Sequence, residues 1–420
     1  MNNTLTRYKL SQLIEVSRGQ SLAGEYYAEQ GKFKRLTLAN FDYQNGGFKE
    51  DSQKTDIYYT GAIKPQCLLN EGDIITPLTE QTPGLLGSTA RIPVSGVYVQ
   101  SGDVALVKCN EELIDPAFCY YLLPSSQVKN QLAAGSQQTK IRHTSPDAIK
   151  DCIVDIPCLE QQKKIGQILD TITAKINENR KQNDLLEKMA KQLYDYWFVQ
   201  FDFPDENGRP YKTSGGKMVW NEQLKREIPE GWEVDSLYKI ANFVNGLACQ
   251  KFRPQESEES LPVIKIREMH EGISPDTERV SCNIPEKFKI YNGDILFSWS
   301  ASLEVMMWAN GNGGLNQHIF KVSAKDGFSK YFMYFKLLDY VNIFRVMADA
   351  RKTTMGHITT DHLEQSRIDL PIDLSIIRQF DNKVRPIFDK LVHNTVEINS
   401  LREQVSLLLP LLMTGQATIR

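Results

Sequence analysis

Apolar side chains recur at alternating steps of four and three residues throughout residues 159–198. This heptad spacing is typical of a long helix that packs along its length against another helix. Two positions of the seam, Asn179 and Asn183, are polar, and a buried Asn in such a seam fixes the register of the helices at a cost in stability. A helix over 165–197 would be about 48 Å long. The seam consists of Ile165, Leu169, Ile172, Ile176, Asn179, Asn183, Leu186, Ala190, Leu193 and Trp197.

A second seam with the same steps lies 215 residues further along the chain, and we predict that the two seams pack on each other. Two prolines interrupt it. Pro386 costs about 3 kcal/mol in a straight helix, so residues 373–385 are expected to form a separate or kinked first segment, and Pro410 is expected to end the helix before Leu412. The second seam consists of Phe380, Val384, Ile387, Leu391, Asn394, Ile398, Leu401, Val405, Leu408 and Leu412.

The segments before each seam also match in order, which indicates a tandem duplication. The chain is therefore predicted to contain a globular unit, a long helix, a second globular unit and a second long helix. The matched pairs are 8–22 with 232–247, 35–40 with 263–268, 70–75 with 291–296, and 145–157 with 359–371.

Both globular units read as mixed α and β structure, because short β-branched runs alternate with turn residues. Trp299 and Trp308 are expected in the core. The expected strands are 35–39, 73–76, 88–92, 97–100, 103–108, 292–300 and 314–322, and the expected helices are 116–123 and 146–151.

Composition limits the class of protein. With 420 residues, 41% of them hydrophobic, the chain is long enough for two cores of domain size. It has neither an apolar run of 18 residues nor an apolar leader, so we expect a cytoplasmic protein without a membrane span. The seven cysteines lack a CxxC pair, which favours reduced thiols over a disulfide framework or a metal site. The net charge of −3 does not by itself favour nucleic-acid binding, unless basic residues are gathered on one surface.

A polar stretch occupies the same place in each repeat, at 135–145 and at 348–360. Its side chains are of the types that contact phosphates or base edges, although a solvated loop has the same composition. We assign phosphate contacts to Lys140, Arg142, Arg351 and Lys352, and base contacts to Gln137, Gln138, Thr139 and Thr353. Loops 40–47 and 76–88 are rival reading surfaces. The full candidate DNA-binding set is Gln137, Gln138, Thr139, Lys140, Arg142, His143, Arg351, Lys352, Thr353, Thr354 and His357.

No catalytic motif stands out. The chain contains no Asn-Pro-Pro-Tyr, and Gly215-Gly216-Lys217 lacks the spacing of a phosphate-binding loop. Two function classes remain: a DNA-recognition subunit of a larger enzyme, or a stand-alone DNA methyltransferase or nuclease whose catalytic residues escape motif analysis. A coiled-coil scaffold without a nucleic-acid role is a third and weaker alternative.

Four runs make the chain resemble the specificity subunit of Type I restriction–modification enzymes. They are LYDYWFVQFDFP (193–204), GRPYKTSGGKMVWNE (208–222), IPEGWEVDSL (228–237) and SLLLPLLMTGQATI (406–419). The resemblance implies an α+β fold in which two similar α/β target recognition domains, related by pseudo-twofold symmetry, accompany two long helices paired as an antiparallel coiled coil. The implied parts are a first recognition domain (1–157), a central spacer helix (158–199), a connector (200–227), a second recognition domain (228–371), and a distal spacer helix with the C-terminal tail (372–420).

The resemblance also implies partners. A subunit of this family is non-catalytic and reads a double-stranded DNA target of two half-sites separated by an unread gap, with the paired helices acting as a ruler. It recruits methyltransferase subunits, two per specificity subunit, and restriction subunits. The chain itself would bind no cofactor, because S-adenosylmethionine, ATP and Mg would be held by those partners.

Overall fold

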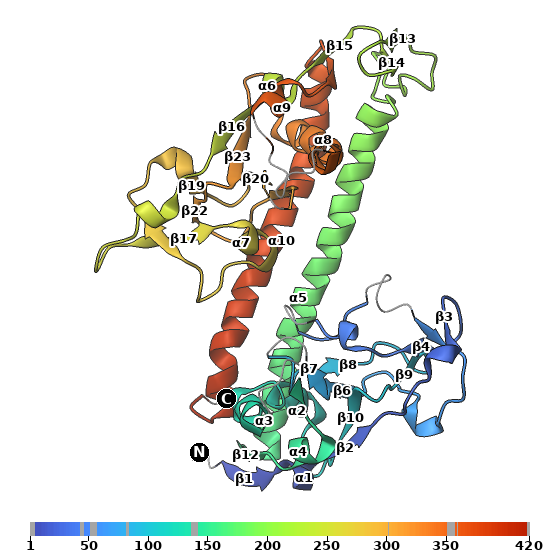
Figure 1. Cartoon of the computed structure of the whole chain (residues 1–420), viewed down its shortest axis with the longest axis vertical. Coiled ribbons are helices and arrows are strands. Elements are labelled where there is room, and N and C mark those ends of the chain that lie inside the picture. Colours follow the sequence, from blue (N-terminus) through green and yellow to red (C-terminus); the bar gives the residue numbers. More distant parts are fainter. Residues whose placement is uncertain are drawn as a thin grey trace. The chain divides into compact units, whose positions relative to one another are not determined.

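The chain forms two compact units in the computed structural model, which describes residues 5–42, 46–50, 57–80, 84–135, 142–300, 302–350, 358 and 360–417. Unit 1 contains residues 1–175 and 401–420, and unit 2 contains residues 176–400. Each unit therefore includes a stretch of both long helices, α5 (Leu159–Tyr194) and α10 (Ser375–Met413) (Figure 1).

Unit 1 is built on an antiparallel sheet of order β2-β10-β6-β8, formed by β2 (Ile14–Arg18), β10 (Val104–Cys109), β6 (Ile74–Pro77) and β8 (Ala90–Arg91). The first four residues of β10 are all buried, because both faces of this central strand are covered. A separate pair joins β1 (Thr6–Lys9) to β12 (Ile153–Ile156), and α1 (Leu10–Leu13) follows β1 directly.

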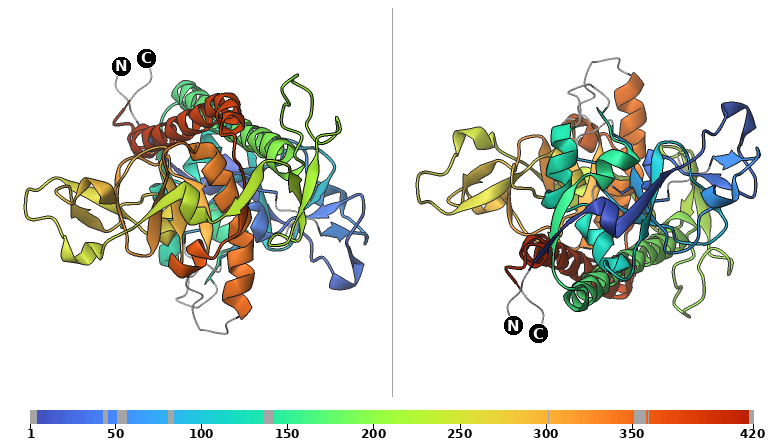
Figure 2. Two further views of the ribbon diagram at one scale, coloured as in Figure 1. Left: turned by 90° about the horizontal axis from the view of Figure 1, so that it is seen from above. Right: turned by 90° about the horizontal axis from the view of Figure 1, so that it is seen from below.

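Three further helices belong to this unit: α2 (Pro116–Leu122), α3 (Ser126–Gly135) and α4 (Pro146–Lys150). Helices α2 and α4 begin where the sequence predicts, because Asp115 and Ser145 cap them and a proline occupies each first turn. A smaller outer sheet has the order β3-β5-β4-β9. Its strands are β3 (Tyr27–Ala28), β5 (Tyr58–Tyr59), β4 (Lys34–Arg35) and β9 (Tyr98–Val99). Figure 2 shows the blue ribbon of this region from above and from below.

Unit 2 repeats this plan. Its main sheet has the order β16-β23-β20-β21, with β16 (Ala241–Asn245), β23 (Ile319–Ala324), β20 (Ile295–Ser298) and β21 (Glu304–Met307). The outer sheet has the order β18-β17-β22-β19, from β18 (Arg279–Ser281), β17 (Ser260–Ile264), β22 (Gly313–Leu315) and β19 (Lys289–Ile290). Pairing of β15 (Trp232–Asp235) with β24 (Ile368–Pro371) matches that of β1 with β12.

The remaining helices of unit 2 are α6 (Leu237–Ile240), α7 (Ile266–Glu271), α8 (Lys330–Ala350) and α9 (Thr360–Glu364). The connector carries an antiparallel hairpin of β13 (Met218–Asn221) and β14 (Arg226–Pro229). Both outer sheets contain one parallel pair, β4 with β9 and β17 with β22. The predicted duplication and the α+β class are thus confirmed at the level of strand order.

The two long helices run antiparallel where they pair in unit 2. Asn179 donates from Nδ2 to Oε2 of Glu397 at 2.7 Å, and one turn later Asn183 donates from Nδ2 to Oγ1 of Thr395 at 3.1 Å. Asn394 in turn donates to Oδ1 of Asn183 at 3.0 Å. Residue numbers rise along one helix as they fall along the other, so the predicted antiparallel pairing is confirmed.

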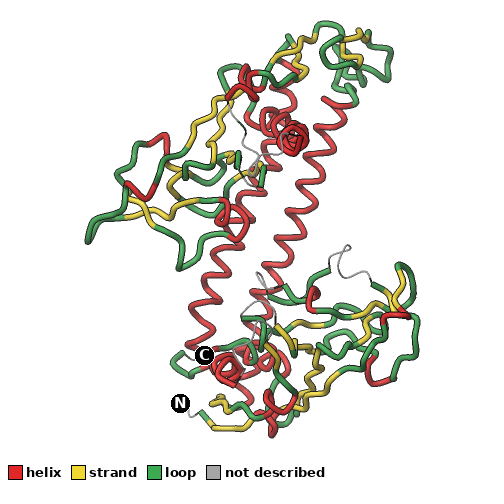
Figure 3. Tube along the Cα trace, in the orientation of Figure 1, coloured by secondary structure: helices red, strands yellow, loops and turns green. Residues whose placement is uncertain are grey.

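The expectations about the prolines are corrected by the structure. Helix α10 is continuous from Ser375 to Met413, and Figure 3 shows each long helix as one uninterrupted tube. Val384 and Phe388 are both buried on either side of Pro386, so packing holds the helix although one backbone hydrogen bond is missing. Pro410 does not end the helix, because its carbonyl accepts the N–H of Thr414 at 3.0 Å.

Two strand predictions are also corrected. Residues beyond Arg35 do not continue the strand expected over 35–39, because Leu38–Asn40 form a 3-10 turn capped by the Thr37 side chain. The single strand expected over 314–322 is two strands, β22 and β23, which belong to different sheets. Trp308 is buried as predicted, whereas Trp299 is half-buried.

Candidate nucleic-acid interface

Most of the residues predicted to bind DNA lie outside the described part of the chain. This applies to Gln137, Gln138, Thr139 and Lys140, and equally to Arg351, Lys352, Thr353, Thr354 and His357. Arg142 and His143 are described, and they form the short strand β11 (Arg142–His143), which pairs with β7 (Thr79–Glu80).

A buried carboxylate fixes this pairing. Glu80 is 3% exposed, and its Oε2 accepts the backbone N–H groups of Gly84, Leu85 and Leu86 at 2.9–3.0 Å. Its other oxygen lies 3.5 Å from Nη1 of Arg142, while His143 is exposed. Glu80 therefore anchors one end of the first polar stretch, and the phosphate contact assigned to Arg142 remains a prediction.

The second polar stretch begins and ends at equivalent points in its own unit. It follows α8 as the first follows α3, and near its end the N–H of Ile358 donates to the carbonyl of Trp299 at 3.1 Å. Near the end of the first stretch, the N–H of Thr144 donates in the same way to the carbonyl of Leu78 at 2.8 Å. Both units thus attach a polar stretch to the strand region that follows β6 or β20.

A cleft not predicted from the sequence lies at the end of β2 in unit 1, and we call it cleft 1. Gly19 allows close approach here, because a Cβ on it would lie 2.3 Å from the carbonyl oxygen of Ser101. Gln20 forms a parallel bridge with Ser101 just beyond this contact. The cavity has a volume of about 660 Å³ and is lined by Arg18, Gly19, Ser21, Leu22, Tyr27, Arg35, Leu36, Thr37, Leu38, Ser101, Gly102 and Asp103.

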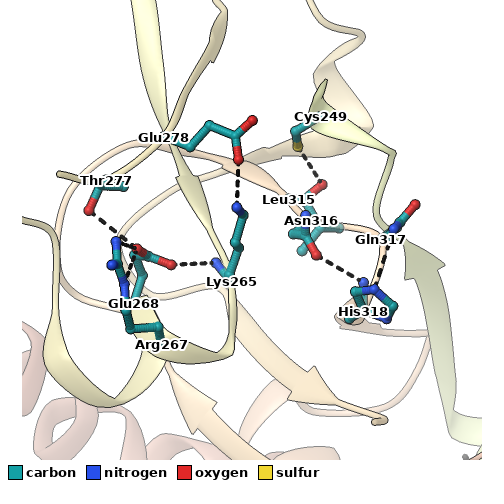
Figure 4. Close-up of polar contacts among 10 residues, drawn as sticks. All are labelled: Cys249, Lys265, Arg267, Glu268, Thr277, Glu278, Leu315, Asn316, Gln317 and His318. Atoms are coloured by element: carbon teal, nitrogen blue, oxygen red, sulfur yellow. Dashed lines mark hydrogen bonds and ion pairs between the residues drawn. The ribbon is translucent and has the colours of Figure 1, made fainter. Parts of the chain in front are cut away.

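Unit 2 has the same backbone construction at the end of β16, and the surface around it is here called cleft 2 because it is equivalent in sequence to cleft 1. A Cβ on Gly246 would lie 2.1 Å from the carbonyl oxygen of Asn316, and Leu247 forms the parallel bridge with Asn316. The adjoining turn is also repeated: the N–H of Lys265 donates to Glu268 at 3.2 Å, as the N–H of Thr37 donates to Asn40 at 2.9 Å. Figure 4 shows polar contacts among the residues of this region.

Cleft 1 carries two guanidinium groups. Arg18 donates from Nε to the carbonyl of Gly102 at 2.6 Å, and Arg35 stacks on the ring of Tyr27 at 4.4 Å. Nε of Arg35 is buried and has no hydrogen-bond partner among the described residues. With Asp103 as the one acidic lining residue, the described lining carries a charge of +1.

The cations beside cleft 2 are instead paired within the unit. Lys265 lies 2.5 Å from Glu278, and its hydrogen bond holds the pKa of Glu278 below the ordinary value. Arg267 lies 2.7 Å from Glu268, which is 1% exposed and also accepts from Thr277 (Figure 4). These pairs leave little free positive charge at this cleft.

Neutral polar groups also lie beside Gly246 in unit 2. Nε1 of Trp299 donates to Oδ1 of Asn245 at 3.0 Å, and its ring centroid lies 5.7 Å from that of His318. His318 is exposed, and its Nε2 lies 3.3 Å from Nε2 of Gln317 (Figure 4). Amide and imidazole groups of this kind both donate and accept hydrogen bonds, as base edges do.

Comparison with known proteins places the chain in a family. The family model for the Type I restriction modification DNA specificity domain matches twice, at residues 2–188 and 229–405. The chain belongs to this family. No helix in the described ranges is both long and apolar enough to cross a membrane.

Two curated relatives cover most of the chain. It is 25% identical over 351 residues to the Type I restriction enzyme MjaIX specificity subunit of Methanocaldococcus jannaschii, covering 80% of this chain and 78% of the relative. It is 24% identical over 374 residues to the HindI specificity subunit of Haemophilus influenzae, covering 76% and 81%. The fold is similar to the crystal structure of a Type I S subunit from M. genitalium, with a TM-score of 0.62 at 13% identity, over 98% of this chain and 96% of that chain.

Proposed function

We propose that the chain is the non-catalytic specificity subunit of a Type I restriction–modification complex, reading a bipartite DNA target with an unread spacer. The observation that carries this proposal is a repeated backbone frame: the same glycine approach, parallel bridge and hydrogen-bonded turn recur in both units with different side chains. A repeated frame with changed side chains is what two unlike half-sites require, because base edges are distinguished by their donors and acceptors.

Each unit would read one half-site with its cleft and its polar stretch together. The DNA-binding candidates within 137–143 and 351–357 remain part of this proposal. Each stretch is joined by a backbone hydrogen bond to the residue that follows β6 or β20, a strand of the main sheet in its unit. The rival surface at 76–88 overlaps this region, because β7 with Glu80 lies within it, whereas the surface at 40–47 remains a separate alternative.

The partners follow from the family. The complex would contain double-stranded DNA, two methyltransferase subunits and restriction subunits in the cytoplasm, with S-adenosylmethionine, ATP and Mg held by those subunits. The assembled complex would be an adenine-specific DNA methyltransferase and a Type I site-specific deoxyribonuclease. A non-catalytic role is supported by the match to the specificity-domain family. The buried acids Glu80, Glu268 and Asp369 bind donors of the chain itself. These acids serve the fold.

Methylation mapping tests the proposal. The chain is expressed with a Type I methyltransferase subunit from its own source genome in a host lacking other adenine methylation, and the host genome is sequenced with a method that detects N6-methyladenine. We expect methylation at one bipartite motif, and no methylation when either protein is expressed alone. Methylation by the chain alone would instead identify a stand-alone methyltransferase, and methylation without any shared motif would refute a specificity role.

A further inference from the structure

The two clefts share a frame but differ in how their cations are paired. Arg18 uses only Nε in a described hydrogen bond, to the carbonyl of Gly102, and Arg35 contacts the Tyr27 ring with no described carboxylate beside it. In cleft 2, Lys265 and Arg267 each lie within 2.7 Å of a carboxylate oxygen. Only cleft 1 therefore offers guanidinium groups without a carboxylate partner among the described residues.

The geometry of cleft 1 suits an anionic oxygen. Tyr27 fixes the plane of the Arg35 guanidinium, which reduces the entropy lost when this side chain binds a ligand. The buried Nε of Arg35 lacks an acceptor, and a buried donor is costly until it finds one. Hydroxyl groups of Ser21, Thr37 and Ser101 line the same cavity, and hydroxyls are common phosphate ligands.

The geometry of cleft 2 suits base edges. Its cations each face a carboxylate, and this nearby negative charge weakens their attraction for a phosphate. Asn245, Gln317 and His318 remain as the polar groups with exposed or half-buried side chains. An amide can donate to and accept from a single base edge, which gives sequence discrimination.

We propose, building on the function proposed above, that the two clefts divide the work of binding DNA. Cleft 1 binds a backbone phosphate of the duplex through Arg18 and Arg35. Cleft 2 makes no phosphate contact and reads base edges through Asn245, Gln317 and His318. Unit 1 thus contributes salt-dependent affinity at its cleft, whereas unit 2 contributes discrimination at the equivalent place.

Salt dependence separates these roles. Affinity of the chain, assembled with its methyltransferase subunit, is measured between about 50 and 200 mM salt on a duplex with the mapped motif and on a random duplex. The double variant Arg18→Gln with Arg35→Gln should reduce the magnitude of the slope of log affinity against log salt by about 0.9, the value for one phosphate contact. Its affinity for both duplexes should fall by the same factor. Arg18→Lys with Arg35→Lys should retain most of the slope because the charge remains.

Matched variants in cleft 2 provide the control. Lys265→Met with Glu278→Gln removes one cation and one anion and should leave the slope unchanged. Gln317→Ala should lower the affinity for the motif duplex only, by roughly 5- to 150-fold, which corresponds to a lost base contact of ~1–3 kcal/mol. The salt slope should stay unchanged. Circular dichroism checks that each variant is folded.

Three results would count against the division of roles: an unchanged slope in the double arginine variant, a loss confined to the motif duplex in that variant, or a lowered slope in the Lys265 control. The second result would make the arginines base readers. If the unaltered complex does not prefer the motif over random DNA, the proposed function itself fails, and the two failures are distinguishable.

Discussion

Two glycines make the same close backbone approach in both units. Gly19 and Gly246 each let a strand end pass within van der Waals contact of a neighbouring backbone carbonyl, which any side chain would obstruct. Neither has a positive φ, so the requirement is for space rather than for an unusual backbone conformation. The residues around them differ between the units, while the close approach does not.

Replacing these glycines should therefore damage one cleft at a time. Gly19→Ala should impair reading of one half-site and Gly246→Ala that of the other, because the strand end must shift away from the carbonyl at a cost of about 1–3 kcal/mol. Genome sequencing of methylated sites measures the effect: each variant should methylate a motif that is relaxed at a different half-site. Gly24→Ala is the control, since its Cβ would meet nothing closer than 3.9 Å. Identical effects of both cleft substitutions would contradict separate reading by the two units.

The elements of unit 2 are joined by a buried ionic group. Asp369 on β24 lies 3.0 Å from Nζ of Lys336 on α8 and also binds Arg226 on the β13–β14 hairpin. Burial alone would raise the pKa of Asp369, but the two cations outweigh it and hold this pKa below its ordinary value. The carboxylate thus connects the connector hairpin with a strand and a helix that lie more than a hundred residues further along the chain.

Asp369→Asn should destabilise unit 2 by about 3–5 kcal/mol, because it leaves the Lys336 ammonium, 5% exposed, without a counter-charge. All five tryptophans lie within residues 176–400, so urea unfolding followed by tryptophan fluorescence reports on unit 2. Arg226→Gln is the milder comparison, since this side chain is 42% exposed. An equal loss in both variants would show that Lys336 does not depend on Asp369.

The same group gives a pH dependence. Because the pKa of Asp369 is lowered in the folded state, its stabilising contribution is complete above the ordinary value of about 3.9 and is lost as the pH falls through the lowered pKa. Unit 2 of the unaltered chain should therefore lose stability below about pH 4. Asp369→Asn should remove this part of the acid dependence.

The helix pair shows a different use of polar groups. Asn179 and Asn394 are fully buried, and each donates from Nδ2 to the facing helix while its Oδ1 has no partner among the described residues. An unpartnered buried oxygen is costly, whereas the interhelical bonds form only in one register. The asparagines therefore lower the stability of the helix pair but fix the register in which α5 and α10 pack.

At the scale of the whole molecule, the paired helices are expected to set the gap between half-sites. A heptad with the same seam spacing, inserted after Asn183 and another after His393, would lengthen both helices at facing positions, because Asn183 binds Asn394 directly. The added rise is about 10 Å, so the preferred gap should grow by about three base pairs.

A methylation assay on duplexes of graded gap length measures this change. The half-site sequences should remain the same, because neither cleft is altered. A heptad in only one helix is the control and should disrupt the complex, since the facing seams would no longer match. A gap that stays constant in the doubly extended chain would show that the helices do not determine the spacing.

Much of this architecture was determined by the sequence alone, because it depends on periodicity. The seams from Ile165 and from Phe380, the capped helices beginning at Pro116 and Pro146, and the order of the repeats are local patterns that a helix or strand expresses directly. The repeated segments also contain Gly19 and Gly246 at matching places, but their close backbone approach was not predicted from this match.

The tertiary structure decided what depends on distant partners. Pro386 and Pro410 remain helical because buried neighbours hold them, although local propensity predicts a break. The charges at the clefts were equally invisible in the sequence: Arg35 and Lys265 are both cations in matched segments, yet only folding brings Glu278 to Lys265 and leaves Arg35 on Tyr27. Local pattern determines the elements, whereas long-range pairing determines which charges stay available to a ligand.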